Sequence, residues 1–212
     1  MTTLQRIAAP NLPLAQQEYG RQYQDQLNNV LRLYFNLLDS SVNGVIGVNG
    51  GQYVDCPSGL FFDTADQPIA VANTAYPVVY NQTYLSNAVA LTTTSRIGVS
   101  VGGIYNFQYS GQLESTNNSP KNVFLWIRRN GIDVGFSTRA YSISGSGAYA
   151  PIAYGFDIDM EDGEYLELMI SASDTTVQLA AGAASSPHPG IPSSVMTVNF
   201  IAPLPSPRPT PP

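Results

Sequence analysis

Residues 102–113, GGIYNFQYSGQL, limit the fold of this chain more narrowly than any other stretch. Amide and hydroxyl residues alternate along one parity, at positions 106, 108, 110 and 112. The other parity holds the apolar side chains Tyr105, Phe107, Tyr109 and Leu113. Successive side chains of a β-strand point to opposite faces of a sheet. The alternation therefore predicts a strand with one aromatic face and one polar face that carries no charge.

Short runs of similar character follow one another between residues 58 and 201, separated by turn residues such as STNNSP, RNGID, SGSG and MEDGE. Many short strands at this spacing are typical of an antiparallel sandwich. Apolar periodicity of helical length is missing from the segment, which excludes a nucleotide-binding α/β unit. The predicted strands are 58–63, 69–72, 76–80, 88–90, 95–101, 103–114, 121–129, 132–134, 137–144, 149–159, 163–171, 175–181 and 194–201.

The N-terminal part, residues 1–40, predicts an extended arm followed by a helix over residues 15–38, ended by Ser40, Asn43 and Gly44. Apolar side chains recur at intervals of 4-3-4-3, the spacing of an a/d heptad seam. Two uses of this seam stay open: the helix lies on its own domain, or it self-associates or docks on a larger assembly. The seam residues are Tyr23, Leu27, Val30, Tyr34 and Leu37.

The organisation predicted from these segments is an arm and helix over 1–40, a linker over 41–51, a β-domain over 52–201 and a tail over 202–212. Six of the eleven tail residues are proline, which favours a polyproline II conformation. Such a tail is either solvated or laid across a neighbouring subunit as a stiff arm.

Charged residues make up only 11% of the chain, and the net charge is −6. Because affinity for nucleic acid comes from clustered Lys and Arg, this composition argues against a nucleic-acid partner. Apolar runs of about 20 residues are missing, so we expect no membrane span, and no secretory signal is recognisable. Cys56 is the only cysteine and is expected to be a buried, unreactive thiol.

Candidate catalytic residues are few. The single histidine, His188, stands between prolines without the motif of a hydrolase nucleophile, and one His with one Cys cannot form a zinc site. The acidic residues Asp157, Asp159 and Glu161 share strand parity; calcium binding or paired carboxylates are conceivable, but a strand followed by a turn at Asp162–Gly163 is the favoured interpretation. We therefore predict a protein that is not an enzyme, with no catalytic residue, cofactor or metal.

Three motifs resemble those of C1q/TNF-like domains. GGIYNFQYSGQL is similar to their G-x-Y-x-F strand, NVFLWIRRNGIDV (122–134) to their strand that ends in an N-G turn, and DMEDGEYLELMI (159–170) to their L-x-x-G-D-x-V-x-L strand, with Glu164 in the place of Asp. The resemblance covers residues 52–201 and implies a ten-stranded jelly roll in a compact homotrimer. It makes three aromatic residues candidates for the core or the three-fold axis: Tyr105, Phe107 and Tyr109.

Residues 4–39 resemble a leader found on virion structural proteins of tailed bacteriophages, including phages of marine and cyanobacterial hosts, where it precedes variable modules. This resemblance implies a virion-anchoring role. The expected function is a homotrimeric capsid decoration or cement protein that binds the major capsid protein on the virion surface. The alternative is a tail-fibre or receptor-binding module for a host-surface glycan, and a sugar-degrading enzyme is the least favoured possibility.

Overall fold

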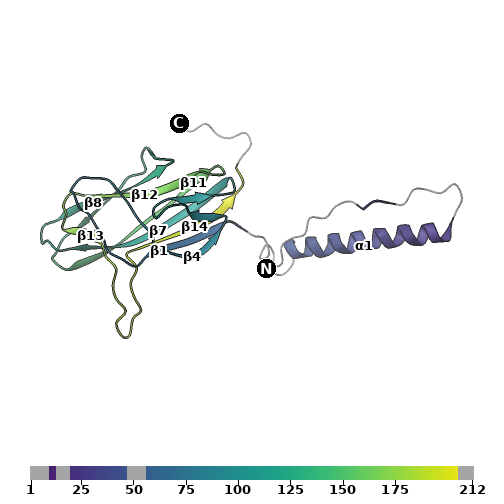
Figure 1. Ribbon diagram of the computed structural model, residues 1–212, viewed down its shortest axis with the longest axis horizontal. Helices are drawn as coiled ribbons and strands as arrows, with labels where there is room; N and C mark the ends of the chain where they lie inside the picture. Colours follow the sequence, from purple (N-terminus) through teal and green to yellow (C-terminus); the bar gives the residue numbers. More distant parts are fainter. Residues whose placement is uncertain (1–9, 13–19, 47–55, 205–212) are drawn as a thin grey trace. The chain divides into compact units, whose positions relative to one another are not determined.

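The computed structural model describes residues 10–12, 20–46 and 56–204 of the chain (Figure 1). The chain divides into two compact units, Met1–Asp55 and Cys56–Pro212. Among the described residues, the helix lies in the first unit and the strands lie in the second. We describe each unit by itself. The Pro-rich residues 205–212 lie outside the described residues.

Helix α1 spans Arg21–Ile46, which corresponds to about 39 Å at 1.5 Å per residue. Gly20 precedes it, and its carbonyl accepts a hydrogen bond from the amide of Gln24 at 3.1 Å, as expected of a residue that caps the helix. The start predicted at residue 15 falls among residues that are not described.

The predicted end of the helix is wrong, because α1 continues through Ser40, Asn43 and Gly44 into the segment predicted as a linker. These residues each disfavour a helix by about 1 kcal/mol or less. Propagation of an existing helix tolerates such small costs, whereas a proline would have stopped it.

Seven strands form sheet A, in the order β2-β13-β7-β14-β1-β4 with β11 paired to β7. β11 follows β7 along its whole length, whereas β14 and β13 pair with successive stretches of β7. The strands are β1 (Ser58–Asp63), β2 (Gln67–Pro68), β4 (Gln82–Asn87), β7 (Gly103–Ser115), β11 (Ala148–Met160), β13 (Val177–Leu179) and β14 (Ser194–Ala202).

Sheet B has the order β10-β8-β12-β6-β5, with β3 paired to β12 and β9 paired to β8. Its strands are β3 (Tyr76–Pro77), β5 (Val89–Leu91), β6 (Ile97–Val99), β8 (Lys121–Arg129), β9 (Ile132–Asp133), β10 (Arg139–Ile143) and β12 (Tyr165–Ala172). Every strand pair in both sheets is antiparallel. The predicted fold class, a mainly β antiparallel jelly-roll sandwich with one helix, is confirmed.

Several predicted strands are shorter in the structure or shifted at their ends, and at two places the prediction is wrong about whether a strand exists. Residues 69–72 contain no strand, since β2 ends at Pro68, and strand β4 was not predicted at all. β4 is an edge strand whose first five residues are exposed, so its sequence QTYLSN has no apolar alternation to reveal it.

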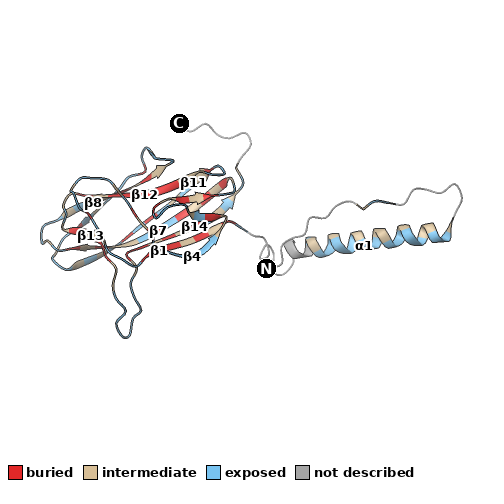
Figure 2. Ribbon diagram, viewed as in Figure 1, coloured by how far each residue is buried: buried red, intermediate tan, exposed pale blue. Residues whose placement is uncertain are grey.

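The core lies between the two sheets (Figure 2). It is formed by every second side chain of each long strand, namely those that point inward. Aromatic side chains from three neighbouring strands of sheet A meet there: Phe107 stacks on Phe156 with ring centroids 5.2 Å apart, and Tyr105 meets Phe200 edge-on at 5.5 Å. Offset stacking and edge contacts of this kind add to the burial of apolar area.

The turn between β8 and β9 has Asn130 and Gly131 at φ of 48° and 83°. Two consecutive positive φ values are the signature of the type I′ turn that Asn-Gly favours in hairpins. The N-G turn expected from the sequence is therefore present.

Truncating Phe107 tests the central position of this core. We expect Phe107→Ala to lower the free energy of unfolding by about 3–5 kcal/mol, because it removes a fully buried ring and leaves a cavity. Denaturant titration of the full chain measures this loss. Tyr84→Ala is the matched control: Tyr84 is 81% exposed on the edge strand, and its loss should change stability by less than about 0.5 kcal/mol.

Candidate assembly surfaces

The aromatic residues of β7 lie in the core of the single chain. Tyr105, Phe107 and Tyr109 are all buried without any partner chain. The Tyr105 hydroxyl donates to the Val101 carbonyl at 2.6 Å, and the Tyr109 hydroxyl lies 3.5 Å from Ser194 Oγ. Burial raises the pKa of Tyr109 well above its ordinary value. The sequence left two locations open for these side chains, the core and the three-fold axis. In the structure they lie in the core.

The side chains of β7 that point away from the core form the centre of a surface that we call the outer face of sheet A. Its outward side chains from Ile104 to Gln112 carry no charge, and the outward side chains of β14 between Val195 and Asn199 carry none either. Leu60 and Phe62 of β1 are half-buried on this side. Amides and hydroxyls can hydrogen-bond to a partner without the desolvation penalty of a buried charge.

Charged groups begin at the β11 border of this face and are already engaged there. Asn106 Nδ2 donates to Asp157 Oδ1 at 2.6 Å, and Asp159 Oδ1 lies 3.6 Å from Arg129 Nη1. Met160 is fully buried at the end of the same strand, and Gly163 makes the turn with a φ of 83°. The acidic cluster is thus a strand followed by a turn, as the favoured interpretation expected.

The five seam residues of α1 lie along one stripe of the helix. Tyr23, Leu27, Val30 and Tyr34 are half-buried, and Leu37 is 49% exposed. Along residues 21–42, where the burial of the helix is described, no side chain is buried (Figure 2). A single amphipathic helix with an uncovered apolar stripe is marginal in water, since most helical stability in proteins comes from packing of that stripe.

Charged residues of the helix support the heptad assignment independently. Asp25, Arg32 and Asp39 recur every seven residues. With Leu27 and Tyr34 at position a, they occupy position f, the outermost position of a coiled coil. Leu31 and Leu38 occupy position e and widen the stripe. The seam was predicted from the spacing of apolar residues alone. The seven-residue spacing of the charged residues is a second signal for the same heptad in the sequence.

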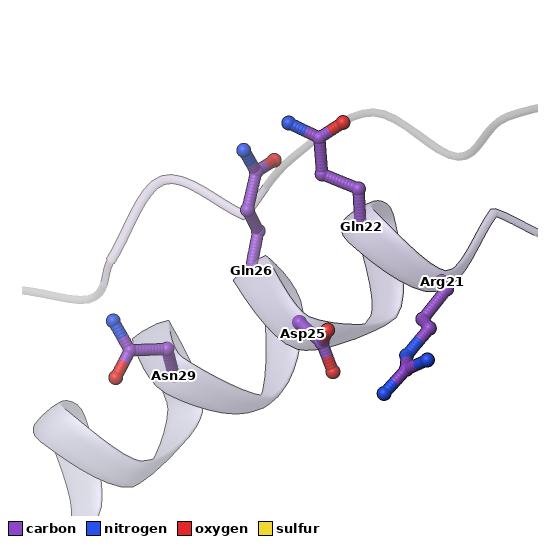
Figure 3. A pocket seen from close by; sticks show the side chains of 5 residues that line it. All are labelled: Arg21, Gln22, Asp25, Gln26 and Asn29. Atoms are coloured by element: carbon purple, nitrogen blue, oxygen red, sulfur yellow. The ribbon is translucent and has the colours of Figure 1, made fainter.

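A polar depression covers the first turns of α1 (Figure 3). It is lined by side chains of the helix that are all exposed: Arg21, Gln22, Asp25, Gln26 and Asn29. Figure 3 shows Gln22 and Gln26 projecting together on one side and Arg21 and Asp25 on another. Ligand sites are concave and bury most of a ligand's surface. The five side chains here lie in a row on one exposed helix and cannot enclose a ligand, so we do not assign a ligand site to them.

The two residues with the greatest intrinsic reactivity stand apart from each other. His188 lies at the tip of an exposed hairpin, where its Nδ1 is 3.0 Å from the Pro189 carbonyl. Cys56 is exposed just before β1, so the prediction of a buried thiol is wrong. Its position at the entry to the sandwich explains this, because the core begins only with the strand that follows.

Groups of three or more His, Cys, Asp or Glu side chains that could hold a metal ion do not occur within the described ranges 10–12, 20–46 and 56–204. In the same ranges, no helix has the length and apolar character needed to cross a membrane.

Comparisons with known proteins find similar solved structures. No protein-family model matches the chain, and no curated protein matches it either. Among solved structures, the chain is similar to the globular domain of a zebrafish complement 1qA protein, at 15% identity and a TM-score of 0.46, over 69% of this chain and 97% of that one. The function is therefore argued from the surfaces of this chain.

Charging the seam of α1 tests whether the helix depends on a partner. We expect Leu27→Asp to abolish most of the contribution of α1 to the circular dichroism signal at 222 nm, because a carboxylate cannot be buried in an apolar seam. Asn29→Asp is the matched control, since it adds the same charge on an exposed position beside Arg32. Equal signals from both variants would show that the helix is stable by itself.

Proposed function

We propose that this protein is a non-enzymatic structural subunit that assembles into a homotrimer and decorates the capsid of a tailed bacteriophage. In this proposal, the N-terminal unit associates with its copies and with the shell of major capsid protein, and the sandwich is displayed on the virion surface. The protein is made in the cytoplasm of the host bacterium. The phage setting rests on the resemblance of residues 4–39 to virion leaders.

The observation that carries the proposal is the uncovered seam of α1. Its apolar stripe and the f-position charges Asp25, Arg32 and Asp39 fit a bundle of identical helices. A β-branched Val30 at d next to a Leu27 at a is compatible with more than two strands, since Leu at a with a β-branched residue at d favours higher oligomers.

The outer face of sheet A supports a second contact between subunits. It combines half-buried Leu60 and Phe62 with the amides of Asn106 and Gln108, and the stretch of β7 and β14 described above is uncharged. The cores of protein–protein interfaces are likewise depleted of charge. Association through this face would join the sandwiches of three subunits.

A tail-fibre or receptor-binding module is the second candidate. It is favoured by the same uncharged amides together with two exposed tyrosines, Tyr84 and Tyr149. Tyr offers an apolar ring and a hydroxyl to a partner, a combination suited to neutral glycans. Decoration is preferred because the chain has no fibrous repeat that would form a shaft.

Counting copies in purified particles separates the two candidates. Quantitative mass spectrometry should find the protein at a copy number comparable to that of the major capsid protein. A handful of copies per particle would instead favour the tail.

The anchoring role of the helix is tested in the same particles. Leu27→Asp should reduce incorporation by about tenfold or more, since burying the new charge costs well over 1.4 kcal/mol. Asn29→Asp should be incorporated normally. Normal incorporation of the Leu27 variant would contradict the proposed role of α1.

A further inference from the structure

The chain that pairs with one side of β8 is interrupted opposite Trp126. β9 pairs with Arg128 and Arg129, and β10 pairs with Lys121–Leu125. Between these two strands, residues 134–138 leave the ladder and belong to no strand. Local breaks in a ladder, such as β-bulges, re-aim side chains and are frequent beside functional sites.

The interrupting segment is nevertheless fixed to β8. The amide of Val134 donates to the Ile127 carbonyl at 2.9 Å, and the Ile127 amide donates to Ser137 Oγ at 3.1 Å. Ser137 Oγ in turn donates to the Val134 carbonyl at 2.7 Å. The serine hydroxyl thus takes the place of a backbone acceptor, so Ile127 keeps a partner for both of its backbone groups.

Phe136 lies within this fixed segment with its side chain in solvent. Its φ is 58°, in the left-handed region that bulky residues rarely adopt, and its side chain is fully exposed. Strained backbone persists only where the surrounding structure holds it, and it clusters at binding sites. The hydrogen bonds through Ser137 provide this support, which points to a binding role for Phe136.

The segment forms one wall of a groove of about 390 Å³ on the outer side of sheet B. Phe124 and Trp126 form its floor, because β8 buries the residues between and beside them in the core. The wall consists of Val134, Gly135 and Phe136. Ligand pockets have volumes of roughly 300–1,000 Å³, so this groove has room for a small ligand.

The floor of the groove has a packed apolar neighbour. Met169 of β12 is paired with Trp126 and lies on the same side of the sheet, since Leu168 and Ile170 belong to the core on the other side. Although it lies on the outer side, Met169 is only 1% exposed. The aromatic floor is therefore part of a packed layer and is present before any ligand binds.

The polar groups at the rim balance one another in charge. Asp133 and Thr138, at the two ends of the wall, add a carboxylate and a hydroxyl to the lining. Arg128 Nε donates to Asp133 Oδ1 at 2.7 Å. This bond holds the pKa of Asp133 below its ordinary value, so the carboxylate stays ionised and the guanidinium balances it. The side chain of Asp133 is 54% exposed, so the pair is accessible to a neutral ligand.

A neutral sugar has the chemistry that these groups complement. The C–H groups on one side of a sugar ring are attracted to the negative faces of aromatic rings, and its hydroxyls lie around the edge. Those hydroxyls can donate to the Asp133 carboxylate and accept from the Arg128 guanidinium. A purely aliphatic ligand would instead desolvate the rim groups without pairing them, which costs free energy.

We propose that this groove binds a neutral oligosaccharide, with one sugar ring stacked on Phe124, Trp126 and Phe136 and its hydroxyls bonded to Arg128 and Asp133. The groove belongs to sheet B, whereas the exposed tyrosines considered above belong to sheet A. It shares no residue with the seam of α1 or the outer face of sheet A. Sugar binding is therefore compatible with either candidate function, and its loss would leave assembly unchanged.

Fluorescence reports on this groove directly, because Trp126 is the only tryptophan of the chain. The full chain is titrated with four neutral trisaccharides: maltotriose, cellotriose, laminaritriose and mannotriose. At least one of them, at millimolar concentration, should shift the emission to shorter wavelength and reduce quenching by acrylamide, since a stacked sugar excludes water from the indole.

Two variants show whether the response arises in the groove. Phe136→Ala should weaken sugar binding by about tenfold, because it removes the aromatic wall. Its thermal unfolding and its sedimentation should match those of the wild-type chain, since the side chain is fully exposed. Ile132→Ala is the matched control: Ile132 is 75% exposed on β9 and does not line the groove, so its removal should leave binding unchanged.

Three results would overturn the proposal. One is an emission spectrum that none of the four sugars changes, and another is equal affinity of the Phe136→Ala and wild-type chains for the sugar. The third is a response to tetramethylammonium that is stronger than the response to every sugar and falls with added salt, which would mean that the groove recognises a cation. Because sedimentation is measured separately, a failure of sugar binding is distinguished from a failure of assembly.

Discussion

The pairing of β7 with its neighbours is the interaction on which the rest of the sandwich depends. This 13-residue strand pairs with β11 on one side and with β14 and β13 on the other. Its inward parity brings Tyr105, Phe107 and Tyr109 against aromatic and apolar partners from both sides. A register slip of one residue would move this entire set to solvent. The same register therefore determines that polar, uncharged side chains of β7 point outward, where they are available to a partner.

The sequence predicted the sandwich well because alternation and turn chemistry are local signals. Strand β8 was predicted at its observed bounds, and the Asn130–Gly131 turn has the backbone that this dipeptide favours. Strand β4 was missed because an exposed edge strand needs no alternation. The helix end was misplaced because weak helix formers such as Ser40 and Gly44 lower stability without stopping propagation.

The candidate surfaces were only partly predictable, and the reason is that they depend on contacts between distant segments. The seam residues of α1 lie in one continuous stretch of sequence, so Leu27 and Val30 could be recognised directly from their spacing. The loop after β9 could not be recognised in this way, since Phe136 takes its exposed position only after hydrogen bonds through Ser137 have joined this loop to β8. Whether the aromatic residues of β7 face the core could likewise be decided only by the second sheet.

The chain thus combines a sandwich that buries its own core with a helix whose apolar stripe is left uncovered in the described residues. We propose that identical helices associate through this stripe. Sedimentation equilibrium of the full chain measures the resulting assembly. We expect a mass of three times 22.8 kDa, and a single species of 22.8 kDa at all concentrations would rule out the association.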